Sequence, residues 1–131
     1  MQFLLLVYTD TEMLEALPEG RFDTMMRECL GHADELVGEG KILGFQQLEE
    51  PATAKSVRIR AGRTSVVDGP FAETKEILGG FNLIEADSME EAVRMASEFP
   101  WAKVGCIEVR PVRDITKARQ RVGADVATTA A

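Results

Sequence analysis

Apolar positions recur along the chain with periods that change from segment to segment, and these periods predict the secondary structure. Residues 2–8 form an unbroken apolar run, which is typical of a strand covered on both faces. Between residues 22 and 37 the apolar positions recur at helical spacing, and Gly38 and Gly40 then end the segment. The apolar face of this predicted helix consists of Phe22, Met26, Cys29, Leu30, Ala33, Leu36 and Val37.

The rest of the chain predicts further strands and a second helix. Residues 61–63 turn one short alternating strand back onto the next and so predict a β-hairpin. The run from Ser88 to Glu91 matches a capping box that opens the second helix, and Pro100 ends it. The predicted strands are residues 41–48, 56–60, 64–67, 80–86 and 105–110.

This order of elements predicts an α+β fold, a ferredoxin-like split βαβ arrangement with an inserted β-hairpin. We place one domain at residues 1–112 and a C-terminal extension, partly disordered, at residues 113–131. Two helices cover only one face of such a sheet, yet the first strand is apolar on both faces. Because monomers rarely expose so large an apolar patch, we predict a homodimer in which sheet packs against sheet.

Composition and charge limit the classes of protein to which this chain can belong. The 131 residues are 45% hydrophobic and 28% charged, the balance of one globular domain. A net charge of −7 disfavours direct binding to nucleic acid or to an anionic membrane. The first apolar run is short and lacks a basic leader, and no segment is long enough to cross a bilayer, so we expect a cytoplasmic protein. Cys29 and Cys106 match no metal or redox spacing, and we predict no metal site.

The most distinctive segment is residues 68–76, which read Asp-Gly-Pro-Phe-Ala-Glu-Thr-Lys-Glu and are soon followed by Gly79-Gly80-Phe81. This string resembles the signature of the DGPF branch of the YCII-related family, small bacterial proteins with mostly unassigned biochemistry. The resemblance covers residues 1–112 and includes Val109-Arg110-Pro111 near its end. It implies a dimeric α/β barrel, in agreement with the dimer expected from the first strand.

The resemblance also implies a catalytic pair. In the broader family a histidine on the first helix and an aspartate act together, and His32, the only histidine, lies on the corresponding helix here. We take His32 as a candidate general base or acid and Asp68 as the group that orients it or shares its proton. The alternatives are a solvent-exposed His32 and an Asp68 that organises the turn before Gly69. Many relatives carry an acidic residue before the proline after the second helix, where this chain has Phe99.

Four further residues are candidate ligand contacts. Arg58 and Arg110 lie in the polar phase of predicted strands, where a guanidinium can hold an anionic substrate group through two hydrogen bonds. The alternative is that they are solvated or pair with Glu108. Glu73 and Lys75 of the signature either bind a ligand or make local surface contacts.

These observations lead to two hypotheses about function. The first is a cofactor-free enzyme that carries out proton transfer or elimination on a small organic molecule in a dimer cavity. The second is a non-catalytic module that binds a small ligand, which the resemblance links to sigma-factor-dependent transcription control. A cavity that holds both His32 and Asp68 would favour the enzyme.

Overall fold

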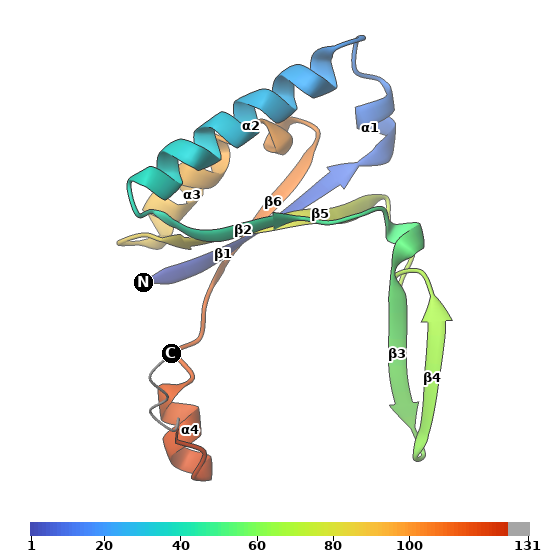
Figure 1. The fold of residues 1–131 in the computed structure, drawn as a ribbon, viewed down its shortest axis with the longest axis vertical. Helices are drawn as coiled ribbons and strands as arrows, with labels where there is room; N and C mark the ends of the chain where they lie inside the picture. The colour runs from blue at the N-terminus through green and yellow to red at the C-terminus, as the bar shows by residue number, and fades with distance from the viewer. Residues whose placement is uncertain (126–131) are drawn as a thin grey trace.

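A four-stranded antiparallel sheet organises the computed structural model, which describes residues 1–125 (Figure 1). Its strands are β1 (Gln2–Asp10), β2 (Ile42–Gln47), β5 (Glu76–Glu85) and β6 (Gly105–Pro111), in the spatial order β2-β5-β1-β6. Neighbouring strands pair antiparallel throughout the sheet. The predicted α+β class is therefore confirmed, and the strand order is that of a split βαβ arrangement.

Helices α2 (Arg21–Gly38) and α3 (Met89–Ser97) cover one face of the sheet (Figure 1). The predicted capping box opens α3: Ser88 Oγ accepts a hydrogen bond from the Glu91 backbone N–H at 3.1 Å. The Glu91 carboxylate accepts in return from the backbone N–H of Asp87 at 2.9 Å, one residue before the cap. No helix among residues 1–125 is long and apolar enough to span a membrane.

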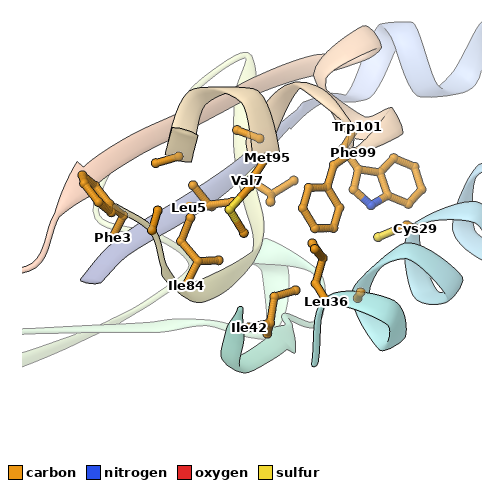
Figure 2. Close-up of a cluster of buried hydrophobic side chains, with 14 of the residues drawn as sticks. Phe3, Leu5, Val7, Cys29, Leu36, Ile42, Ile84, Met95, Phe99 and Trp101 are labelled. Carbon is orange, nitrogen blue, oxygen red and sulfur yellow. The ribbon is translucent and has the colours of Figure 1, made fainter. Parts of the chain in front are cut away.

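The core lies between this helix layer and the sheet (Figure 2). Phe3, Leu5 and Val7 of β1 point toward the helices, and α2 meets them with side chains spaced four, four and three residues apart. These buried α2 residues are Met25, Cys29, Ala33 and Leu36. Trp101 and Phe99 close the core beside α3, from the short 3-10 turn η2 (Pro100–Lys103) and the residue before it.

One position on α2 differs from the prediction. The sequence pattern placed Met26 on the buried face, but Met25 is the methionine that packs in the core, with 1% of its surface exposed. Met26 lies at the edge of the apolar stripe, together with Phe22 and Leu30. Apolar spacing marks a broad stripe on the helix, but it does not say which edge of that stripe meets other side chains.

Two arms extend from the opposite face of the sheet (Figure 1). One is the predicted hairpin, formed by β3 (Lys55–Arg60) and β4 (Arg63–Asp68), which pair only with each other. Most of its side chains are exposed, including Val57 and Ile59 at 62% each. The other is α4 (Thr116–Val122) in the C-terminal extension, where the sequence suggested no helix. Partial disorder was predicted for the extension at residues 113–131, of which residues 126–131 lie outside the described residues.

The face of the sheet between these arms has no covering layer within the described chain. Leu4, Leu6 and Tyr8 of β1 lie on this face and stay partly exposed. Register places Leu83 opposite Leu4 and Phe81 opposite Leu6, so the apolar surface continues onto β5. We call this surface the open face.

Gly105 lets β6 approach β1 closely. A Cβ atom at this position would lie 2.7 Å from the Cα atom of Thr9 and still closer to the Tyr8 carbonyl oxygen. Both obstacles belong to the backbone of the central strand, so a side chain at residue 105 cannot be accommodated by a rotamer change.

We therefore expect Gly105→Ala to lower the free energy of unfolding by about 2–3 kcal/mol, because the two strands must move apart. Gly44→Ala is the matched control, since Gly44 also lies in a strand but a Cβ there meets no atom within 4 Å. Urea unfolding followed by circular dichroism measures both variants. Equal stability of the two would show that the close approach of β6 is unimportant.

Candidate functional site

A cavity of about 610 Å³ lies on the helix side of the sheet, between α2, the start of β5 and the segment that follows β2. Its walls are mainly apolar and aromatic. Phe22, Met26 and Leu30 line it from α2, Phe45 from β2 and Trp101 from η2. Cavities of this size and lining are typical of sites for small organic molecules.

The cavity explains why α2 carries exposed apolar residues. Phe22 and Leu30 are 41% and 39% exposed, although both belong to the apolar stripe of the helix. One edge of the stripe packs in the core and the other lines the cavity. The centroids of the Phe22 and Trp101 rings lie 5.5 Å apart, and the ring planes form an angle of 41°. The two rings therefore form an aromatic wall on this side of the cavity.

Asn82 is the buried polar residue of the cavity. It lies on β5 between Leu5 of β1 and Phe45 of β2, and this register turns its side chain toward the helix layer. Only 7% of its surface is exposed. Among the described residues, the Asn82 side-chain amide makes no hydrogen bond, and it lines the cavity, so its polar atoms are open to water or to a ligand. The sequence prediction did not single out Asn82. A lone amide side chain within an apolar strand could have marked it as a candidate polar group of a site.

Cys29 lies on α2 beside Trp101 (Figure 2) and also lines the cavity. Burial raises the pKa of the Cys29 thiol above its usual value, and the neighbouring Trp101 indole lowers the pKa by a smaller amount. The thiol therefore stays protonated at neutral pH, which makes it a weak nucleophile and a weak base.

The electrostatic character of the cavity is neutral to acidic. None of the described residues that line it is lysine, arginine or histidine. Glu49 and Glu50 lie on its edge, in the segment after β2. An anionic ligand would find no countercharge in this lining, in contrast to the expectation that an arginine holds an anionic substrate.

The structure does not bring His32 and Asp68 together. His32 lies on α2 against α3: its ring contacts the Phe99 ring edge-on at 4.9 Å, and Nε2 lies 3.1 Å from Glu98 Oε2. Asp68 lies at the end of β4, which extends from the side of the sheet opposite α2 (Figure 1). Neither residue lines the cavity. Within one copy, the helix that carries His32 and the hairpin that ends at Asp68 lie on opposite sides of the sheet (Figure 1).

Asp68 and Arg58 instead hold the base of the hairpin. The Asp68 side chain is 81% exposed and pairs with Lys55, its cross-strand neighbour. The Arg58 guanidinium donates to the Phe71 carbonyl oxygen at 3.5 Å. Gly69 has the positive φ of 93° expected for this turn, and its N–H donates to the Ala54 carbonyl oxygen at 2.7 Å.

The other candidate ligand contacts also have local roles. Arg110 Nε lies 2.7 Å from Glu108 Oε2 on the same strand, which is the pairing considered as the alternative to ligand binding. Glu73 is exposed and makes no hydrogen bond or ion pair with residues 1–125. Lys75 Nζ lies 3.6 Å from Asp10 Oδ2. None of these three residues lines the cavity.

Asp10 links the signature to the cavity wall. Its carboxylate is buried at the end of β1 and accepts hydrogen bonds from the backbone N–H groups of Glu12 and Met13, which caps α1 (Thr11–Glu15). Lys75 reaches the same carboxylate from the signature, just before the residues of β5 that line the cavity. An aspartate followed by a short polar run was a recognisable capping signal that the sequence prediction missed. No cluster of metal-ligating side chains occurs within the described part of the chain.

The fold and the site define a small α+β protein with an apolar cavity beneath its longest helix. The chain belongs to the YCII-related family, because the model of the YCII-related domain matches residues 1–116. An uncharacterized protein of Rhizobium meliloti (strain 1021) is 36% identical over 114 residues, which span 86% of this chain and 92% of the relative.

A solved structure is also similar to this chain. It is the 5-chloro-2-hydroxyhydroquinone dehydrochlorinase TftG from Burkholderia phenoliruptrix AC1100, in complex with 2,5-dihydroxybenzoquinone. The match covers 86% of this chain and 94% of that chain, with 17% sequence identity and a TM-score of 0.45.

Burial and a raised pKa should make Cys29 slow to react with thiol reagents. In a Cys106→Ser variant, in which Cys29 is the remaining thiol, we expect Ellman's reagent at a pH of about 8 to label the native protein at least tenfold more slowly than the unfolded protein. Absorbance of the released thiolate measures both rates, with guanidinium chloride as the unfolding agent. Equally fast labelling of the native protein would mean that Cys29 is accessible and activated.

Proposed function

We propose that this protein binds a small, largely apolar organic molecule in the cavity beneath α2. The observation that carries the proposal is the cavity itself, whose apolar and aromatic walls include the side-chain amide of Asn82. Pockets that recognise small molecules combine such walls with a few polar groups that fix the orientation of the ligand.

Binding is supported better than acid–base catalysis. Of the described residues that line the cavity, only Cys29, Glu49 and Glu50 carry ionisable side chains. The raised pKa of Cys29 keeps its thiol protonated, and the two glutamates are exposed residues at the edge of the cavity. The residues first considered for proton transfer, His32 and Asp68, contact other groups. Among the described residues of one copy, no acid and base converge in this cavity, and ligand binding is therefore the function that we propose.

Nile red, a neutral apolar dye whose fluorescence increases in apolar surroundings, tests the proposal. We expect saturable binding to the wild-type protein. Leu30→Trp should weaken binding at least tenfold, because a larger side chain at the wall of the cavity occupies the space of the dye. Fluorescence titration measures the dissociation constants.

Val93→Trp is the matched control, since Val93 is 50% exposed on α3 and does not line the cavity. This variant should bind the dye like the wild type. Equal affinities in all three proteins would place the dye elsewhere and contradict the proposal.

We also propose that the protein is a homodimer in which the open faces of two copies meet. The partly exposed Leu4, Leu6 and Tyr8, continued by Phe81 and Leu83, would then be buried between two sheets. The hairpin supports the same arrangement, because a two-stranded ribbon is marginally stable unless something packs on it. Val57 and Val66 are paired across the hairpin and are 62% and 57% exposed in one copy.

Charge favours contact between the hairpin and a second copy. Four basic residues and one acidic residue give residues 55–68 a net charge of +3. Since the whole chain carries −7, the remaining residues carry −10. A basic arm that extends past the open face of one copy would meet an acidic partner, which steers association.

Sedimentation equilibrium tests the dimer. We expect the wild-type protein to have twice the 14.4 kDa mass of one chain. Leu6→Asp should shift the equilibrium to monomer, because it buries a carboxylate in an apolar interface. Val93→Asp adds the same charge on α3 and should leave the dimer intact. A monomeric wild-type protein, or equal masses for both variants, would contradict the proposed interface.

A further inference from the structure

We infer that Asn82 recognises a neutral amide-like edge on a planar ligand, one that presents a hydrogen-bond donor and an acceptor side by side. This inference rests on the proposed binding function and adds the chemical class of the ligand. A cyclic cis-amide fused to an aromatic ring, as in a heteroaromatic lactam, represents the class.

The environment of Asn82 singles it out as a recognition group. The residue is 93% buried, because only 7% of its surface is exposed, and its strand neighbours Leu5 and Phe45 have no polar side-chain atoms to offer it. Among residues 1–125 its amide makes no side-chain hydrogen bond. Because the amide lines the cavity and has no partner within these residues, its donor and acceptor are available to a molecule from outside the chain.

The chemistry of the amide defines what that partner must offer. A carboxamide side chain presents an N–H donor and a carbonyl acceptor on the same edge. A cis-amide presents the complementary acceptor and donor, so the two edges form a pair of hydrogen bonds. A carboxylate offers only acceptors, and an ether or ester offers no donor, so neither satisfies the carbonyl oxygen of Asn82.

The charges around the cavity exclude an anion as the preferred ligand. The described lining contains no basic side chain, while Glu49 and Glu50 lie on its edge. A carboxylate entering the cavity would lose its hydration shell without gaining a countercharge. A neutral group avoids this cost.

The walls favour a flat body on the ligand. Phe22 and Trp101 form an aromatic wall from α2 and η2, and Phe45 lies beside Asn82 in the register of β2 with β5. Aromatic side chains pack well against the faces and edges of other rings. A planar ring can therefore occupy the apolar space while its polar edge reaches Asn82.

Three probes with similar ring systems test this inference: 2-quinolinone, its N-methyl derivative and 2-naphthoate. Displacement of Nile red from the wild-type protein measures their affinities. We expect 2-quinolinone to bind about tenfold more tightly than the N-methyl derivative, which lacks the donor. It should exceed 2-naphthoate by at least the same factor, because the naphthoate is charged and lacks the donor.

The variant Asn82→Leu removes the amide while keeping an apolar side chain of similar size. With its own Nile red dissociation constant measured first, this variant should bind 2-quinolinone and its N-methyl derivative with equal affinity. Thermal unfolding provides a second readout: 2-quinolinone should raise the melting temperature of the wild-type protein more than that of Asn82→Leu, because it binds the folded wild type more tightly.

The outcomes distinguish a failure of the proposed binding function from a failure of the proposed recognition by Asn82. If the wild-type protein fails to bind Nile red at the cavity, the proposed function is wrong, and this inference is lost with it. If Nile red binds but 2-quinolinone and its N-methyl derivative have equal affinities for the wild type, the cavity binds ligands without recognition by Asn82. A preference for 2-quinolinone that persists in Asn82→Leu, or preferential binding of 2-naphthoate, overturns the inference in the same way.

Discussion

The burial of β1 at the centre of the sheet is the interaction on which the rest of the structure depends. β5 and β6 pair with its two edges, so its backbone is hydrogen-bonded on both sides. Its Phe3, Leu5 and Val7 form the floor of the core, and the alternate residues of the same strand form the open face. One apolar strand thus supplies the core of the protomer and, in the proposed dimer, the centre of the interface.

The second constraint is that the apolar stripe of α2 packs in the core along one edge and lines the cavity along the other. The helix carries more apolar residues than the core can take up, since Met25 and Ala33 are buried while Phe22 and Leu30 remain partly exposed. The residues at the edge of the stripe line the cavity, and β5 supplies its polar group from below. The signature loop contributes indirectly, because Lys75 contacts Asp10 just before the part of β5 that reaches the cavity.

Local signals in the sequence predicted much of the fold, whereas the site depends on contacts between distant residues. The capping box at Ser88 and the alternation of β3 were visible because each depends on a few neighbouring side chains. The separation of His32 from Asp68 was not, since it depends on which side of the sheet each element occupies. The position of Asn82 in the cavity was equally hidden, because a polar side chain that faces a cavity is recognised only when its surroundings are known.

The proposed binding of a ligand in the cavity has a consequence for the abundance of the protein in the cell. If the proposed ligand fills the cavity, it binds the folded chain and not the unfolded one. It then raises the free energy of unfolding in proportion to the logarithm of its concentration above its dissociation constant. Chaperones and proteases act on the small unfolded fraction of a protein, and a filled molecule would enter that fraction less often than an empty one. The supply of the ligand would thereby regulate how many copies of the protein persist.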